Sequence, residues 1–342
     1  MAQGTAKRRQ RGTVRVEDVA REAGVSPITV SRTLTNPEKV REDTRRRVTE
    51  AVARTGYVVN RFASTLRSGH STIISAFVSN LANPHFANAL QGCAQALEGG
   101  RYHLLMAQTG YSDKLQQAMV EKVLPFRPAA ALFTGIVQSR RTRAMLKKLD
   151  VPVMEMWDHR ADPIDMLVGF SNAEGGRLIG AHFADRGYTR VAYAGRTADR
   201  GAQRIEGFTA GFGRAPDLVL PLEGSRTAID GERALATILG KLPGCDAVFF
   251  GTDLLAVGAI DHARRNGIAV PGRVAIAGYG DLDVSRQLAT PLTTVHVSGF
   301  EMGNIAGKLL LKRLRGESIA ERIVLSPISL EVRDSTGGPR QP

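Results

Sequence analysis

Groups able to do acid–base, nucleophilic or metal chemistry are present in this sequence, but their spacing does not form a catalytic site. Asp281 and Asp283 are the nearest approach to a carboxylate pair, and they flank a turn, where solvated carboxylates are expected. The seven histidines are scattered, without the i, i+4 pairs with which a helix binds a metal. No P-loop, no GxGxxG between strand and helix and no GxSxG elbow occurs. We therefore expect no enzyme activity, no cofactor and no metal.

The charge of the chain is concentrated in its first part. The 342 residues carry a net charge of +13, and residues 1–70 contain 15 Lys and Arg against 7 Asp and Glu. Such a basic block attracts a polyanion, and nucleic acid, an acidic membrane surface or a simple gain in solubility would each explain it. A hydrophobic content of 43% is enough for one large core or two moderate ones beside a small module.

The cysteines and the N-terminal residues indicate in which cellular compartment the protein is expected. Cys93 and Cys245 have no neighbouring Cys or paired His, so neither a disulfide framework nor a zinc site is indicated. The basic N-terminal run is not followed by an apolar stretch, and no window approaches the roughly 18 apolar residues of a membrane helix. We expect a cytoplasmic protein without a membrane partner.

Short helices are predicted near the N-terminus. Apolar residues recur at helical spacing at Val16, Val19, Ala20 and Ala23. Gly24 follows where a helix would be capped, and Ser26 and Pro27 mark the start of a second helix. Proline is tolerated only in the first turn of a helix, which fixes that start. A third helix is expected from about Asp43 to Thr55.

The spacing of the first two helices is that of a helix-turn-helix, whose second helix enters the major groove of DNA. An ordinary helical hairpin has the same spacing. The charge favours the DNA-binding interpretation, because the second helix carries Thr29, Ser31 and Arg32, which can bond bases or phosphates. Further phosphate partners are available in Arg15, Arg45, Arg46 and Arg47.

From Thr72 onward, continuous apolar runs alternate with amphipathic segments. The runs that we expect to be strands lie at 72–79, 102–109, 130–135, 151–158, 166–171, 190–195, 217–222, 247–252, 273–280 and 292–298. The expected helices lie at 84–100, 114–124, 142–149, 173–186, 203–211, 230–242, 254–266 and 302–315. Continuous rather than alternating apolar residues are typical of parallel sheets covered on both faces. The two series predict two doubly wound lobes, with any ligand at the carboxyl ends of the strands.

Several motifs resemble those of a known family. VEDVAREAGVSPITVSRTL, followed by TRRRVTEAVARTGYVVNRFASTLRSG, resembles the DNA-binding headpiece of the LacI–GalR family of bacterial repressors. The most specific parts are DVA, AGVS, TVSR, Gly56-Tyr57 and Asn60-Arg61, and the likeness continues to about Arg333. VSNLANPHFANALQG and VGFSNAEGG are most similar to the gluconate-utilisation repressors of that family. The resemblance implies a small all-α headpiece and a two-lobed α/β domain like that of periplasmic binding proteins.

Domain boundaries follow from these changes of pattern and from the resemblance. We expect a flexible basic arm at 1–15, a helix-turn-helix domain at 16–59, a hinge segment at 60–71, an effector-binding and dimerisation domain at 72–334, and a tail at 335–342. Within the large domain, one lobe is expected to comprise 72–168 with 296–322 and the other 169–295 with 323–334.

The resemblance implies which residues contact DNA. Pro27 and Ile28 would touch thymine methyl groups, and Arg32 would bind a guanine with two hydrogen bonds. An alternative role of Pro27 is only to set the helix start. In the hinge segment the implied minor-groove residues are Asn60, Ala63 and Leu66, the leucine being the wedge between base pairs. Val59 stands where many relatives have proline, so the hinge would be more mobile.

The resemblance also implies an effector pocket. Arg204 matches an arginine that binds a ligand carboxylate or hydroxyl, although a surface arginine at a helix start is the alternative. Other pocket residues are expected at strand ends: Asn80, Asn83, Phe86, Thr134, Trp157, Asp158, Phe170, Thr252, Asp253 and Asp281. Asp253 would alternatively cap the helix that follows it.

Departures from the family pattern bear on the ligand. Gly280 stands where many relatives have an aspartate, so that GYGD replaces GYDD or GYDN. Two interpretations stay open: Asp281 takes the ligand-binding role of that aspartate, or the role is absent from this chain. Val297 replaces a frequent polar residue. Fewer carboxylates beside Arg204 favour an anionic ligand, in agreement with a sugar acid such as gluconate.

These observations predict a regulator of transcription. We expect a homodimeric repressor, associated with the nucleoid, that binds a palindromic double-stranded operator with an affinity changed by a sugar or sugar-acid effector. The C-terminal residues contain no leucine heptad, so a dimer is favoured over a tetramer. The alternative is a soluble carbohydrate-binding receptor or an α/β enzyme with an incidental basic module, although a periplasmic receptor would need a signal peptide.

Overall fold

A computed structural model describes residues 14–58, 71–222 and 227–337. The chain divides into two compact units, one ending at His70 and the other beginning at Ser71. The predicted hinge contacts Asn60, Ala63 and Leu66 lie outside the described residues, as do nearly all of the expected arm and most of the tail. Among the described residues, no helix is both long enough and apolar enough to cross a membrane.

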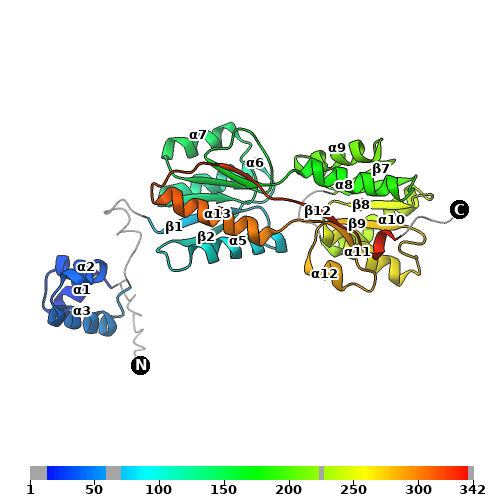
Figure 1. Cartoon of the computed structure of the whole chain (residues 1–342). Helices are drawn as coiled ribbons and strands as arrows, with labels where there is room; N and C mark the ends of the chain where they lie inside the picture. The colour runs from blue at the N-terminus through cyan, green and yellow to red at the C-terminus, as the bar shows by residue number, and fades with distance from the viewer. Residues whose placement is uncertain (1–13, 59–70, 223–226, 338–342) are drawn as a thin grey trace, which may run out of the picture. The chain divides into compact units, whose positions relative to one another are not determined.

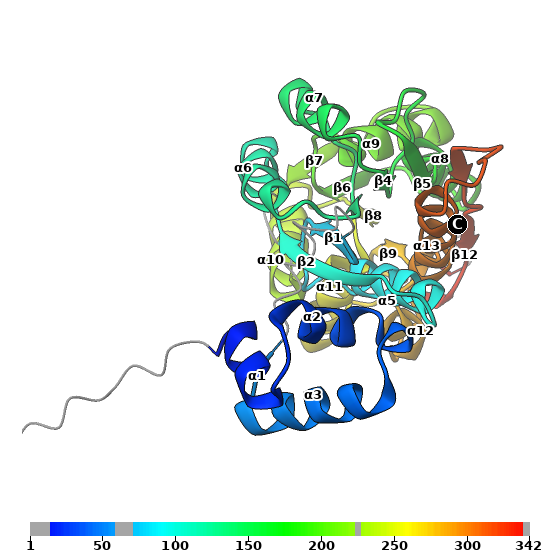
Figure 2. The same ribbon diagram turned by 90° about the vertical axis from the view of Figure 1, so that its left-hand side faces the viewer.

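The N-terminal unit is a bundle of short helices. The helices are α1, Val16–Ala23, α2, Pro27–Thr35, a 3-10 turn at Pro37–Lys39, and α3, Glu42–Thr55 (Figure 2). Its core is formed by Val19, Ala20, Ala23, Val30, Val48 and Ala51. So small a core makes every helix cap count in the stability of the unit.

The predicted junction between α1 and α2 is confirmed. Gly24 ends α1 with a φ of 63°, in the left-handed region that glycine adopts without strain. The hydroxyl group of Ser26 accepts a hydrogen bond from the backbone N–H of Thr29 at 3.1 Å, and Pro27 occupies the first turn of α2. The two helices are therefore separated by the short turn of a helix-turn-helix.

The second unit contains two six-stranded sheets (Figure 1). The first has the order β11-β5-β4-β3-β1-β2 and is parallel throughout. Its strands are β1, Ile73–Val78, β2, His103–Gln108, β3, Ala130–Phe133, β4, Val153–Met156, β5, Met166–Gly169, and β11, Ile323–Leu325. The predicted parallel, doubly wound lobe is thus confirmed for this sheet.

The second sheet has the order β12-β10-β9-β8-β6-β7. Its strands are β6, Val191–Gly195, β7, Leu218–Pro221, β8, Ala247–Phe250, β9, Ala275–Gly280, β10, Thr293–His296, and β12, Ser329–Glu331. All neighbours are parallel except β12, which runs antiparallel to β10.

Helices cover both faces of each sheet. In the first lobe, α5, Pro84–Leu97, and α13, Gly299–Leu314, pack on one face, while α6, Asp113–Val123, and α7, Arg140–Leu149, pack on the other. In the second lobe, α8, Asn172–Asp185, and α9, Arg200–Phe212, face α10, Ala228–Lys241, and α11, Asp253–Arg265, across the sheet. Because every central strand is covered twice, its residues are apolar without alternation.

The chain crosses between the lobes at 170–171, 297–298 and 326–328. The expected boundary at 322/323 was wrong, because β11 pairs with β5 in the first sheet and the last crossing comes after it. The three-residue strands β11 and β12 and the short helix α12, Asp283–Gln287, were not predicted. They are too short to show a periodic pattern in the sequence.

Helices α8 and α9 approach each other closely through glycine. A Cβ atom at Gly207 of α9 would lie 1.8 Å from the carbonyl oxygen of Ala173 in α8, and one at Gly180 of α8 would lie 2.3 Å from that of Phe208. The backbones therefore touch where most helices are held apart by side chains. This packing fixes α9, which carries Arg204.

A Gly207→Ala substitution is expected to lower the free energy of unfolding by about 1–3 kcal/mol, because the new methyl group must push two backbones apart. Gly240→Ala is the matched control, since Gly240 is exposed near the end of α10 and a Cβ atom there meets nothing within 4 Å. The control is expected to be neutral or stabilising by about 0.5–1 kcal/mol. Urea unfolding followed by circular dichroism measures both, and equal stability of the two variants would contradict this account of the helix contact.

Candidate functional site

The second helix of the N-terminal unit presents an exposed face. Ile28 is 71% exposed, and Arg32 lies one turn further along the same helix and is also exposed. Within the described residues, no side chain pairs with Arg32. Pro27, beside Ile28, is exposed as well. These three predicted DNA contacts are therefore accessible.

The other two predicted contacts of this helix are partly used by the helix itself. Thr29 is half-buried, and its hydroxyl group lies 2.8 Å from that of Ser26 within the helix cap. Ser31 is half-buried, and its backbone carbonyl accepts a hydrogen bond from the hydroxyl of Thr35. The exposed arginines of α3 that were expected to meet phosphates are Arg45, Arg46 and Arg47.

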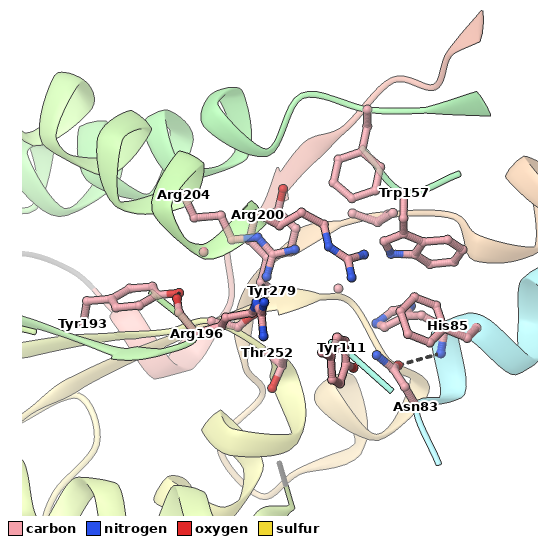
Figure 3. Close-up of a pocket in the computed structure, with 16 residues that line it drawn as sticks. Asn83, His85, Tyr111, Trp157, Tyr193, Arg196, Arg200, Arg204, Thr252 and Tyr279 are labelled. Carbon is pink, nitrogen blue, oxygen red and sulfur yellow. Dashed lines mark hydrogen bonds between the residues drawn. The ribbon is translucent and has the colours of Figure 1, made fainter. Parts of the chain in front are cut away.

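A cavity that is open to solvent lies where the two lobes face each other (Figure 3). Its lining residues are Asn83, His85, Phe86, Tyr111, Trp157, Phe170, Tyr193, Arg196, Arg200, Gly201, Arg204, Gly251, Thr252, Tyr279, Gly280 and Val297. They belong to both lobes, and many of them follow the carboxyl ends of strands, as expected for a ligand site in parallel sheets. The combination of aromatic and polar side chains in the lining suits a small organic ligand.

The cavity contains part of the predicted pocket. The predicted residues that line it are Asn83, Phe86, Trp157, Phe170, Arg204 and Thr252. Asn80 and Asp253 border a smaller adjoining hollow, and Asp158 borders another, beside Arg196 and Arg200. Thr134 is buried, and its hydroxyl accepts a hydrogen bond from the backbone N–H of Ser79 at 2.9 Å.

Asp253 has a structural role in this unit. Its buried carboxylate accepts hydrogen bonds from the hydroxyls of Thr294 and Ser285 at 2.6 and 2.7 Å and from the backbone N–H of Leu282 at 2.8 Å. Burial raises the pKa of this carboxyl group, and the three hydrogen bonds oppose that shift. The carboxylate thus joins α11 to the end of β9 and to β10.

Asp281 is also occupied by protein groups. Arg333, Arg286 and His296 contact its carboxylate at 2.6, 3.0 and 2.9 Å, and the side chain is 2% exposed. Burial would raise the pKa of Asp281, but the hydrogen bonds from Arg333 and His296 together bring it below its usual value. Asp281 does not line the cavity, so it does not supply there the carboxylate that Gly280 lacks.

Arginines four residues apart line one side of the cavity: Arg196, Arg200 and Arg204. Arg204 is held firmly, because its Nε donates to the Oδ1 atom of Asn172 at 2.9 Å and its Nη1 donates to the carbonyl of Gly251. Its guanidinium carbon lies 3.7 Å from the centroid of the Tyr279 ring. Arg204 therefore lines the cavity, with much of its hydrogen-bonding capacity used by the protein.

Arg200 differs from its two neighbours. Arg196 forms an ion pair with Asp199, whereas Arg200 has neither an ion pair nor a hydrogen bond to any residue that the structure describes. Its guanidinium points into the cavity, over the ring of Phe86 at 5.7 Å (Figure 3). Burial lowers the pKa of Arg200, yet a guanidinium stays charged near neutral pH. An unpaired charge in such a position is costly unless a ligand pairs with it.

Prediction from the sequence missed several lining residues. These are His85, Tyr111, Tyr193, Arg196, Arg200 and Tyr279. The spacing of Arg200 and Arg204 is a usable signal, because residues four apart share one side of a helix, whereas Arg196 lies in the loop before α9. Neither an Asp nor a Glu of the described chain lines the cavity, and no cluster of metal-ligating side chains occurs among the described residues.

A helix-turn-helix with an exposed second helix, joined in sequence to a two-lobed unit with a cavity lined by polar and aromatic side chains, is typical of a ligand-responsive DNA-binding protein. Residues 15–60 match the family described as bacterial regulatory proteins, lacI family, and residues 181–336 match a periplasmic binding protein-like domain. The transcriptional regulator GntR of Escherichia coli K12 is 31% identical over 313 residues, which cover 90% of this chain and 94% of that protein.

Other similar proteins are also transcriptional regulators. The GntR regulator of Pseudomonas aeruginosa is 31% identical over 334 residues, covering 96% of this chain and 97% of that protein. A solved LacI-family regulator from Silicibacter pomeroyi has a TM-score of 0.87 at 28% identity, covering 94% of this chain and 99% of that chain. The chain therefore belongs to the LacI family of bacterial transcriptional regulators. It is a DNA-binding regulator with an effector-binding domain, and not an enzyme.

Proposed function

We propose that this chain is a homodimeric repressor whose operator affinity changes when an anionic sugar acid of the gluconate class binds in the cavity between its lobes. The observation that carries the proposal is the charge of the lining, where three arginines stand without a lining carboxylate among the described residues. Arg200 in particular has no partner there. A neutral sugar would leave this guanidinium unpaired, whereas a carboxylate would supply its acceptor.

Other groups in the cavity suit the remainder of a sugar acid. Thr252 lines the cavity, and its buried hydroxyl has no hydrogen-bond partner among the described residues. Tyr111, Trp157 and Phe170 provide aromatic faces for the carbon chain. The resemblance of the 78–92 segment to gluconate-utilisation repressors agrees with this choice of ligand.

A ligand in this position would connect the two lobes. Phe86 and Trp157 belong to the first lobe, and Arg200, Thr252 and Tyr279 belong to the second. An effector that contacts both lobes binds more tightly to one relative position of the lobes than to others. This difference in affinity shifts the equilibrium between the lobe positions. The 59–70 segment joins the helix-turn-helix to β1 of the first lobe and would transmit the change.

The second copy required for a dimer has a suitable surface. On the edge strand β2, Leu105 and Met106 are 49% and 56% exposed, and Leu115 of the neighbouring helix α6 is 59% exposed. Leu105 and Met106 point to opposite faces of the edge strand, and exposed apolar side chains of this kind are common at protein contacts. Two-fold symmetry of the dimer would make the operator palindromic. Such a repressor acts on chromosomal DNA, so we place it in the cytoplasm.

Calorimetric titration with gluconate and with glucitol, its neutral counterpart of equal chain length, tests the ligand class. Gluconate is expected to bind at least about tenfold more tightly, since a hydrogen bond to a charged group contributes about 1.5–3 kcal/mol. Gluconate is then expected to change operator affinity by about 5- to 150-fold in a fluorescence anisotropy assay. Equal binding of the acid and the neutral polyol would contradict the proposed ligand class.

A further inference from the structure

The cavity contains a histidine whose ring nitrogens have no partner in the described part of the chain. His85 follows Pro84 in the first turn of α5, and its backbone N–H donates to the Oδ1 atom of Asn83 at 3.0 Å (Figure 3). Its ring centroid lies 6.4 Å from that of Trp157. The ring is therefore positioned by its backbone and by packing, and its nitrogens remain available to a ligand.

The position of this ring depends on Gly280, the last residue of β9. A Cβ atom at Gly280 would lie 2.1 Å from the Nε2 atom of His85 and 2.8 Å from its Cε1 atom. The φ of Gly280 is 136°, a conformation that favours glycine. The imidazole thus occupies the volume that a side chain at position 280 would fill. The two residues come from opposite lobes.

The ring of His85 is uncharged near neutral pH. Burial lowers the pKa of His85 to about 4, aided by the charge of Arg204 and, more weakly, by His296, while Asp281 acts in the opposite direction. A neutral imidazole has one N–H donor and one nitrogen acceptor. This combination matches a hydroxyl group, which also donates and accepts. A carboxylate in the same volume would only accept, and it would offset the charge of Arg204.

We propose that His85, whose ring fills the volume that Gly280 leaves open, determines specificity by binding a hydroxyl group of the effector's carbon chain. This inference rests on the proposed function, because it takes the effector to be a sugar acid in this cavity. Recognition of hydroxyls by a neutral ring leaves the charges of Arg200 and Arg204 for the acid group of the ligand. The pair His85 and Gly280 thereby selects a ligand that is both polyhydroxylated and anionic.

Gluconate and its monodeoxy analogues, each lacking one hydroxyl group, test the inference with the full-length protein in calorimetric titrations. For the wild type, loss of the hydroxyl that His85 binds is expected to weaken binding about tenfold. In His85→Ala, gluconate itself is expected to bind about tenfold more weakly, and loss of the same hydroxyl should then have no further effect. Such coupling identifies a direct contact, which a merely structural role of the ring would not produce.

A conservative variant and a control variant complete the experiment. His85→Asn retains a donor and an acceptor on a shorter side chain and is expected to recover part of the discrimination, and it carries the comparison if His85→Ala does not fold. His103→Ala removes an exposed histidine of β2 and should leave all affinities unchanged. An unchanged deoxy profile in the His85 variants would overturn the role of His85 and leave the proposed function standing. A wild type that binds no sugar acid would overturn the proposed function itself.

Discussion

An Arg200→Gln variant is expected to bind gluconate about 10- to 150-fold more weakly than the wild type, because a hydrogen bond to a charged partner contributes about 1.5–3 kcal/mol. Arg200 points into the cavity and has no ion pair or hydrogen bond among the described residues, so its N–H groups are available to the ligand, although Tyr111 and Asp158 partly offset its charge from a distance. Glutamine keeps much of the length and a donor but removes the charge. Binding of neutral glucitol should therefore change little, and the acid-to-polyol preference should largely disappear.

A comparison with Arg204→Gln separates the roles of the two arginines. Arg204 is bonded to Asn172 and Gly251 and stacks on Tyr279, so its loss should loosen the cavity wall and weaken gluconate and glucitol alike. Arg264→Gln, an exposed arginine of the same lobe that pairs with Asp261, is the control and should leave both affinities intact. Calorimetry measures all three. If only Arg204→Gln lost the preference for the acid, the assignment of the ligand carboxylate to Arg200 would be wrong.

The sequence pattern does not predict that Arg200 belongs to helix α9. The apolar pattern predicts a helix start at 203, whereas α9 begins at Arg200, so the pattern leaves Arg200 outside the expected helix. Helix starts are poorly marked when, as at Asp199, no side chain caps the first turn. At Ser26 the cap is followed by Pro27 and the sequence predicts the start to the residue, whereas the cap at Ser298 alone does not, since α13 begins at Gly299 and not at 302. The strand and helix order was equally predictable, because each element has enough residues to show its period.

The roles of the buried carboxylates could not be predicted. Asp253 and Asp281 both follow strands, which is where ligand-binding residues are found in parallel sheets. Their partners are distant in the sequence: Asp253 is bonded to Thr294, and Asp281 to Arg333. Local pattern carries no information about such pairings, so position at a strand end predicted the neighbourhood of the site but not which carboxylates face it. The contact of His85 with Gly280 is hidden from the sequence for the same reason.

An Arg32→Ala variant is expected to lose operator affinity by about 100-fold or more, with relaxed base preference at one position in each half-site. A bidentate contact from arginine to guanine discriminates by about 1–3 kcal/mol, and a two-fold symmetric dimer would make the contact twice. Arg32 is exposed, shares a helix face with Ile28 and has no partner among the described residues, so its removal should leave the melting temperature unchanged.

Arg47→Ala provides the contrast, because an exposed arginine of α3 is expected to meet phosphate rather than a base. Its loss should weaken binding to all sequences alike and reduce the salt dependence by about one phosphate contact per subunit. Selection of binding sites from random duplexes, followed by anisotropy at several salt concentrations, distinguishes the two effects. The selected wild-type sites should be palindromic. If Arg32→Ala selected the same sites as the wild type, Arg32 would be a phosphate contact, and sequence recognition by α2 would have to rest on Pro27 and Ile28.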